Sequence, residues 1–311
     1  MILEKQILED FIGERLDKSI FIILKNYSRT EVQGFIKNGF IKVNNCTVKP
    51  SYIISSSDLI LVELANPKNE IIVKENLNID LIFENMDFFI VNKPSGVLTH
   101  LDSKYKTNTL INTFIDKIKI SDFEDKNRPG IVHRLDKDTS GLILITKNLK
   151  AYNYFVDIFK ERKIEKKYYT LVLGLMEHKK GIIDSPITRD IKNRKKMGVS
   201  VDKKAKNAIT EYEVIDEFEF KGQCFSFLDI TLKTGRTHQI RVHMSAISHP
   251  VFGDYLYGNK KINDKFKKEL NRMFLQAYSL KFNERKSNNE MVFNIDIDND
   301  LKQFLDKCVK I

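Results

Sequence analysis

Apolar residues follow two different periods along this chain, and these periods predict helices and strands. Before residue 40, apolar residues at helical spacing predict one helix within 16–24 and a second whose N-cap is Ser28. The alternating segments 40–45 and 59–64 then predict two strands joined through the Asn44–Asn45 turn. The chain therefore begins with a small α/β module.

Longer apolar runs predict a larger domain after residue 76. Strands are expected at 88–94, 130–135, 141–147, 166–174 and 225–232. Helices are expected at 107–118, 148–162, 237–248 and near the C-terminus. These elements alternate without a strand–helix–strand rhythm, which favours a mixed α+β fold over a doubly wound sheet.

A polar segment that contains proline, 65–76, predicts a linker between the two parts. The expected organisation is a module at 13–64, the linker at 65–76 and a larger domain at 77–311. A chain of 311 residues is long enough for one large domain and a small one.

The charge of the chain predicts a polyanionic partner, most simply RNA or DNA. The formal net charge is +10, and residues 1–74 hold 10 Lys and Arg against 9 Asp and Glu, so nearly all of the excess lies after them. The three cysteines are far apart and form no CxxC pair, which predicts neither a zinc site nor disulfides and fits a reducing cytoplasm. No apolar run predicts a signal peptide or membrane span, so we expect a cytoplasmic protein without membrane contact, by default a monomer.

Nine mostly polar residues, HRLDKDTSG, stand between two apolar runs within the stretch 130–146. Both flanks are expected to be anchored in the core, so Asp136 is displayed by a rigid scaffold. The alternative is an ordinary charged surface hairpin. A kinase loop is excluded because the order is His-Arg-Leu-Asp and no Gly-rich phosphate loop is present. A metal site is not indicated, because the histidines lack ligand spacing.

The stretch LKTGRTHQIRVH, 232–243, predicts a strand, a tight turn at Gly235 and a helix capped by Thr237. Buried Ile240, Met244 and Ile247 would form the apolar stripe of this helix. Arg241 would lie on another face, where it reaches a carboxylate such as Asp136 or simply faces solvent.

A basic run, 189–206, holds eight basic residues and two acidic ones. Its interleaved polar residues and Gly198 predict an extended loop suited to phosphate contacts, although a solvated surface run would look the same. The candidate contacts are Arg194, Lys195 and Lys196.

Four motifs in this order resemble those of the RluA-type pseudouridine synthases, particularly the ribosomal large-subunit, RluC/RluD-like members. They are VNKPSGVLTH (91–100), GIVHRLDKDTSG (130–141), KKYYTLVLG (166–174) and LKTGRTHQIRVH (232–243). The segment 13–64 is similar to the RNA-binding alpha-L module that many ribosomal members share with a small-subunit ribosomal protein. The resemblance implies a mainly antiparallel catalytic domain that isomerises uridine to pseudouridine within RNA, most simply large-subunit (23S) ribosomal RNA.

The resemblance also assigns roles to individual residues and implies no cofactor or metal. Asp136 matches the catalytic aspartate, Arg241 its basic partner and Tyr168 the active-site tyrosine, whose ring can pack on uracil while its hydroxyl helps to remove a ring proton. The alternative is that Tyr168 is a core aromatic of its strand; Tyr169 would point to the opposite face. Arg134 matches the side chain that fills the space of the flipped-out uridine. Residues 93–96, KPSG, fit a structural turn that supports the site. Further candidate contacts to RNA or to the loop are His133, Thr139 and Arg236.

Three alternatives remain open from the sequence. One is a transfer-RNA enzyme of the same family, and another is a non-catalytic RNA-binding or ribosome-assembly factor. The triad of Asp136, Tyr168 and Arg241 argues for catalysis, because binding alone needs no carboxylate in a cleft that faces RNA. The third is a metal-dependent RNase, which an activity that survives EDTA would exclude.

Overall fold

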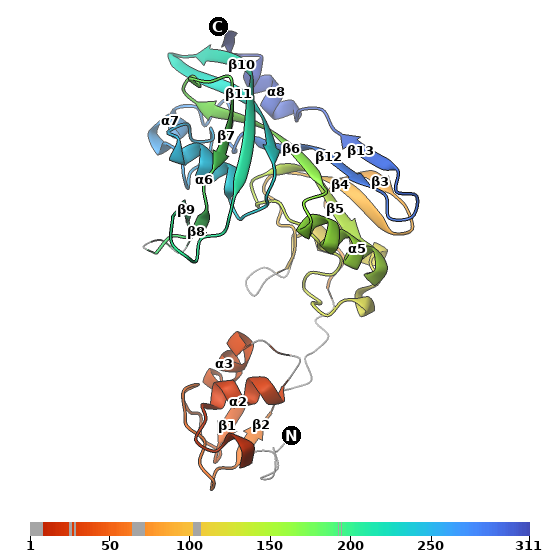
Figure 1. Cartoon of the computed structure of the whole chain (residues 1–311), viewed down its shortest axis with the longest axis vertical. Helices are drawn as coiled ribbons and strands as arrows, with labels where there is room; N and C mark the ends of the chain where they lie inside the picture. Colours follow the sequence, from red (N-terminus) through yellow and green to blue (C-terminus); the bar gives the residue numbers. More distant parts are fainter. Residues whose placement is uncertain are drawn as a thin grey trace. The chain divides into compact units, whose positions relative to one another are not determined.

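The computed structural model describes residues 9–24, 27, 29–63, 72–101, 107–191, 193 and 195–311. Its contacts divide the chain into two compact units, 1–71 and 72–311 (Figure 1). This division falls inside the expected linker, and the last part of that segment contacts the second unit: Ile72 packs on its core, and Asn112 donates a hydrogen bond to the Val73 carbonyl. Two predictions, the N-cap Ser28 and the RNA contact Arg194, lie outside the described residues.

The N-terminal unit packs two helices, α2 (Leu16–Ile23) and α3 (Arg29–Lys37), against strands β1 (Ile41–Val43) and β2 (Ile60–Val62). A 3-10 turn, Glu9–Phe11, precedes them. Asn44 and Asn45 both adopt positive φ in the predicted turn. The expectation that this turn joins the two strands directly is wrong, because the chain bridges back only as far as Cys46 and reaches β2 through residues 47–59.

Asp17, fully buried in this unit, organises its polar side chains. Its carboxylate accepts hydrogen bonds from Arg15, Arg29 and Gln33. Burial raises the pKa of Asp17, but these hydrogen bonds outweigh burial and lower the pKa to about 2. Both arginine side chains remain about half exposed, so they present donors to solvent while Asp17 offsets part of their charge.

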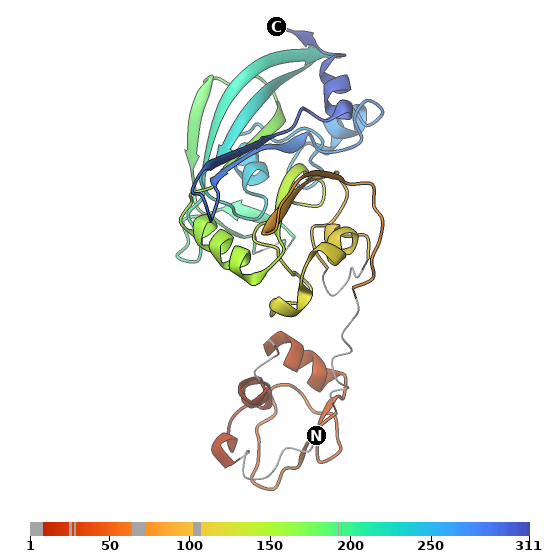
Figure 2. The same ribbon diagram turned by 90° about the vertical axis from the view of Figure 1, so that its right-hand side faces the viewer.

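The second unit is built on a ten-stranded sheet with a single parallel pair, β12 with β5, among its described strands. The sheet order is β14-β10-β11-β6-β12-β5-β4-β3, with β13 beside β12 and β7 beside β10 (Figures 1 and 2). A separate hairpin joins β8 to β9. The strands are β3 (Asp80–Glu84), β4 (Phe88–Lys93), β5 (Ser140–Thr146), β6 (Glu165–Leu173), β7 (Lys180–Asp184), β8 (Ile187–Arg189), β9 (Met197–Val199), β10 (Ile209–Phe220), β11 (Gln223–Leu232), β12 (Leu275–Asn283), β13 (Glu290–Asn294) and β14 (Val309–Lys310).

Both faces of this sheet carry clusters of buried apolar side chains. Successive strand residues point to opposite sides and so contribute to different clusters. One face packs against α4 (Leu110–Phe114) and α6 (Gln239–Ala246), and Phe89, Tyr168 and Ile230 belong to its core. The opposite face carries separate clusters under α5 (Leu149–Lys160) and α8 (Asn299–Leu305). The remaining helical segments are Ile115–Lys117, Ile120–Asp122 and α7 (Lys260–Lys265). None of the described helices is long and apolar enough to cross a lipid bilayer.

The predicted strand at 130–135 is absent. Only Ile131 forms a bridge, to Ile145 on β5, and the chain then leaves the sheet. The His133 ring accepts the hydrogen bond of the Leu144 amide at 2.9 Å, where a neighbouring strand would offer a carbonyl. This segment therefore becomes a loop that runs along β5 and ends at Gly141, whose φ of +112° and close approach to Ala277 leave no room for a Cβ.

Candidate active site

A cavity of about 620 Å³ opens where the loop 131–139, strand β6 and the start of α6 meet. Asp136 is the only acidic side chain among the described residues that line it. Its other charged lining residues are Arg128, Arg134, Lys160, Arg162, Lys166, Lys233, Arg236 and Arg241. Such a cationic surface attracts phosphate groups, and Asp136 is the one carboxylate that the described residues place in it.

Arg241 lies between two carboxylates. Its Nη1 donates to Oδ2 of Asp136 at 3.0 Å. Its other edge holds Asp254 in a bidentate pair, with Nε to Oδ2 at 2.7 Å and Nη2 to Oδ1 at 3.0 Å. Burial lowers the pKa of Arg241, but the two carboxylates outweigh burial and raise the pKa above its usual range. Because Asp254 fixes the guanidinium, Arg241 binds a single oxygen of Asp136 and leaves Oδ1 without a hydrogen bond among the described residues.

A tight turn holds Asp254, which is 1% exposed. The amides of Leu256 and Tyr257 donate to its Oδ1, and the side chain of Asn263 donates to its carbonyl. The position of Arg241 is therefore set by the fold, independently of the loop that carries Asp136.

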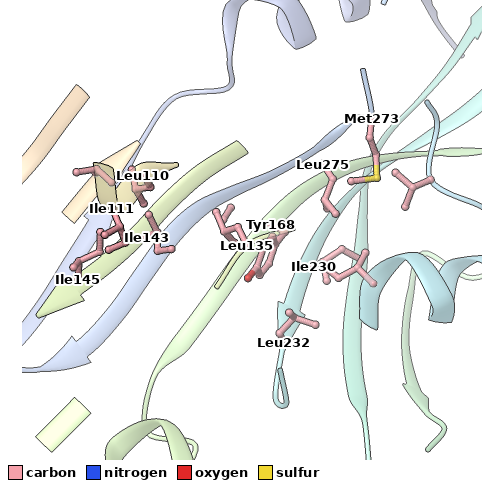
Figure 3. Close-up of a cluster of buried hydrophobic side chains, with 14 of the residues drawn as sticks. Leu110, Ile111, Leu135, Ile143, Ile145, Tyr168, Ile230, Leu232, Met273 and Leu275 are labelled. Atoms are coloured by element: carbon pink, nitrogen blue, oxygen red, sulfur yellow. The ribbon is translucent and has the colours of Figure 1, made fainter. Parts of the chain in front are cut away.

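Tyr168 lies on β6 in the core beside the cavity. Figure 3 shows its ring among Leu135, Ile230 and Leu232. Burial, and then the Asp136 carboxylate, raise the pKa of Tyr168 well above its usual range, so its hydroxyl is neutral at neutral pH. Tyr169 points to the opposite face, where it stacks on Tyr278 with ring centroids 3.8 Å apart.

Lys93 ties the loop to the end of β4. Its fully buried Nζ donates to three carbonyls: that of Pro94 in the KPSG turn, that of Val97 directly after the turn and that of Lys137 in the loop. Three acceptors match the three N–H bonds of an ammonium group. Burial lowers the pKa of Lys93 to about 7, against the opposing effect of Asp138 and Asp136. The predicted structural turn thus has its anchor in Lys93.

The beginning of α6 differs from the prediction. His238, not Thr237, is the N-cap, and it adopts a left-handed conformation with φ of +57° and no capping hydrogen bond from its side chain. Gln239 folds back instead and accepts a hydrogen bond from the Arg236 amide. His238 consequently turns toward the loop, with its Nε2 3.8 Å from Oδ2 of Asp136. The predicted stripe is present, with Ile240 and Met244 buried and Ile247 packed against the core.

The residues predicted to contact RNA differ in their exposure and in their hydrogen-bond partners. Arg134 is exposed at the cavity and makes no hydrogen bond or ion pair within the described part of the chain. Arg236 lines the cavity but donates to the Asn207 carbonyl. Thr139 is buried at the cavity wall, and His133 supports β5 as described above. Burial, and then Lys166, lower the pKa of His133 to about 3.

The basic loop contributes Lys195, which is exposed, and Lys196, whose Nζ lies 5.7 Å from the centre of the Tyr257 ring. The cysteines are free, as the sequence predicted. Within the described ranges, no group of three His, Cys, Asp or Glu side chains could hold a metal ion.

The chain matches known proteins along nearly its whole length. The family model described as RNA pseudouridylate synthase matches residues 87–246, and the S4 domain model matches residues 14–60. An RNA pseudouridine synthase of Bacillus subtilis is 36% identical over 97% of this chain and 96% of its own length. The ribosomal large subunit pseudouridine synthase D of Buchnera aphidicola is 34% identical over 94% of each chain. This chain belongs to the RNA pseudouridine synthase family.

The solved structures agree with this assignment. The human RNA pseudouridylate synthase domain containing 1 aligns with a TM-score of 0.57 at 26% identity, over 71% of this chain and 84% of that one. The expected family, the α+β fold with a mainly antiparallel sheet and the N-terminal RNA-binding module are therefore confirmed. The protein is an RNA pseudouridine synthase, an isomerase.

Three polar residues at or behind the cavity carried no prediction from the sequence: Asp254 and Tyr257, which contact Arg241, and Lys166, which lines the cavity. Asp254 and Tyr257 lie in the stretch FGDYLYG, which follows α6. The spacing of charged residues in this stretch does not predict a contact with Arg241. Lys166 stands in the motif KKYYTLVLG, in which the resemblance assigns a role only to Tyr168. It lies two positions before Tyr168 on the same face of β6, and burial lowers its pKa to about 8.

Replacing Lys93 by methionine should destabilise the catalytic unit of the synthase. The substitution leaves three carbonyls without their donor, so we expect the free energy of unfolding to fall by about 2–3 kcal/mol. Urea unfolding followed by circular dichroism measures this change. Lys137→Met is the matched control, because that side chain is exposed in the same loop. Equal stability of the two variants would contradict the anchoring role of Lys93.

Replacing Asp254 by asparagine should also destabilise the synthase, because it removes the carboxylate that holds a buried guanidinium. We expect the free energy of unfolding to fall by about 3 kcal/mol. The control is Asp264→Asn, an exposed aspartate on α7. Thermal or urea unfolding that does not distinguish these variants would show that Arg241 needs no second carboxylate.

Proposed function

We propose that this synthase converts uridine to pseudouridine in large-subunit ribosomal RNA, with Asp136 as the nucleophile. The observation that carries the proposal is the position of Asp136: the one acidic side chain among the described residues of a cationic cavity, held by Arg241 through one oxygen. Arg241 places a cation beside the carboxylate, and Oδ1, which has no hydrogen bond among the described residues, is available for attack.

The reaction requires the target uridine to leave the RNA stack, at a cost of a few kcal/mol. Arg134 supports this step, because its exposed guanidinium at the cavity has no partner among the described residues and is free to stack in the vacated position. The surrounding basic side chains would bind the flanking phosphates.

In the proposed sequence of steps, Asp136 attacks the flipped nucleotide and the glycosidic carbon–nitrogen bond breaks. The base then turns and its carbon 5 bonds to the anomeric carbon. The bond to Asp136 breaks, which regenerates the carboxylate, and the carbon-5 proton leaves. Tyr168 would pack against the uracil. Because its hydroxyl is neutral in the free enzyme, it can accept the carbon-5 proton only while it passes its own proton on.

Ribosomal RNA is favoured as the substrate by two features. Several relatives at 32–35% identity are named ribosomal large subunit pseudouridine synthase D, and they align with most of this chain. The N-terminal S4 domain supplies a second RNA-binding unit. We extend the expectation of RNA contact to Lys195 and Lys196 of the basic loop, and we retain the prediction that no metal or cofactor is needed.

Tritium release tests this proposal. Unmodified large-subunit ribosomal RNA and transfer RNA, each labelled with tritium at uracil carbon 5, are incubated with the protein in EDTA. Wild type should release tritium from the ribosomal RNA, and Asp136→Asn should lose roughly 10³-fold or more of the rate. Asp138→Asn, an exposed aspartate of the same loop, is the matched control and should retain the wild-type rate.

Other outcomes identify which part of the proposal fails. Release from transfer RNA alone would replace the substrate and leave the role of Asp136 intact. Full activity of Asp136→Asn would reject this residue as the nucleophile. Loss of activity in EDTA that Mg²⁺ restores would contradict a metal-free reaction.

A further inference from the structure

Tyr257 contacts Arg241, Asp254 and His238 and also the basic hairpin formed by β8 and β9. Its ring lies under the Arg241 guanidinium, with 5.1 Å between the ring centre and Cζ, and its amide donates to Asp254. Its hydroxyl accepts a hydrogen bond from the Met197 amide on β9 at 2.7 Å. The same hydroxyl lies 2.8 Å from Nδ1 of His238. No step of the proposed reaction uses this side chain.

These contacts favour one protonation state of His238. The Met197 amide can only donate, so the Tyr257 hydroxyl accepts that bond, and among the described residues Nδ1 of His238 is the acceptor in reach of the hydroxyl's own proton. We therefore take the hydroxyl as the donor to Nδ1. An imidazole that accepts at Nδ1 is neutral and carries its proton on Nε2. That nitrogen is the one that faces Oδ2 of Asp136 at 3.8 Å. Burial lowers the pKa of His238, in agreement with the neutral form.

The Met197 side of the contact belongs to the hairpin that presents the basic loop. Met197 and Tyr257 both pack on a small apolar cluster of Ile187, Ala208 and Val242, which joins the hairpin to α6. Lys196, the residue before Met197, places its ammonium group over the Tyr257 ring. A continuous set of contacts therefore runs from the predicted phosphate-binding loop through Tyr257 and His238 to Asp136.

We propose that Tyr257 is a positioning residue whose hydroxyl couples the docked β8–β9 hairpin to a neutral His238 that presents Nε2–H to Asp136. This inference rests on the proposed role of Asp136. As a consequence, the position of the hairpin, which would contact the RNA, affects the hydrogen-bond donor that faces the Asp136 carboxylate. A protonated His238 would instead pair with Asp136 as a second cation and reduce its nucleophilicity.

Several charged groups face His238 and determine how it titrates. Asp136 and Asp254 favour the imidazolium, whereas Arg134 and Arg241 oppose it. The Tyr257 hydroxyl adds a donor that stabilises only the neutral form. Removing that hydroxyl should therefore raise the pKa of His238.

The decisive variant is Tyr257→Phe, which removes the hydroxyl and keeps the ring. Tyr154→Phe is the matched control, because its hydroxyl donates to the Asn283 carbonyl on the opposite side of the sheet. Single-turnover rates and dissociation constants are measured across pH 5–8 with the tritiated RNA on which wild type acts. We expect the rate constant to fall roughly tenfold and the acid limb to move to higher pH, with the dissociation constant changed by less than about twofold.

Two NMR measurements need no RNA. Nitrogen shifts of the imidazole ring should show His238 protonated at Nε2 in wild type and with a higher pKa in Tyr257→Phe. The Met197 amide should exchange faster with solvent in this variant, because it loses its acceptor.

A double variant tests whether the two residues act together. In a His238→Gln background, Tyr257→Phe should add little to the loss of rate, because both changes break the same connection.

The inference is overturned if Tyr257→Phe leaves the His238 pKa unchanged or retains the wild-type rate. It is also overturned if only RNA affinity falls, or if the effects of the Tyr257 and His238 substitutions multiply in full. Full activity of Asp136→Asn, by contrast, would reject the proposed nucleophile without altering the ring-nitrogen result. The two proposals therefore fail in distinguishable ways.

Discussion

The structure around the cavity depends on the sharing of one guanidinium by two carboxylates. A buried arginine that faced Asp136 alone could take both of its oxygens, and a carboxylate held in that way is a poor nucleophile. Asp254 prevents this arrangement, because it occupies Nε and Nη2 of Arg241 and leaves only Nη1 for the loop. The turn after α6 thus leaves Asp136 held through one oxygen, with the other without a hydrogen bond among the described residues.

The loop that carries Asp136 is held by side chains that take the place of backbone partners. His133 accepts the amide of Leu144, and Lys93 donates to the Lys137 carbonyl. A loop buried against a sheet needs side-chain donors and acceptors of this kind, because its backbone N–H and C=O groups would otherwise lack hydrogen bonds. They also explain how an irregular segment can hold a carboxylate rigidly beside the end of β5.

Local sequence predicted much of this arrangement, and tertiary contacts decided the rest. The opposite faces of Tyr168 and Tyr169 follow from strand period, and the buried stripe of α6 from helical period. The predicted strand at 130–135 failed because a side chain of that segment, His133, satisfies the amide of Leu144. Asp254 lies beyond the motif that contains Arg241, so spacing could not reveal their pairing, which depends on the turn that returns the chain to α6.

The distribution of charge indicates which unit supplies most of the attraction to RNA. Residues 1–74 have a net charge close to zero. In that unit, Asp17 accepts hydrogen bonds from Arg15 and Arg29 and offsets part of their positive charge. The cavity, in contrast, gathers eight basic side chains around Asp136. Because counterion release grows with the number of phosphates neutralised, the larger unit should dominate the salt dependence of binding. The near-neutral N-terminal unit, which holds the S4 domain, should add little to this salt dependence, because it neutralises few phosphates.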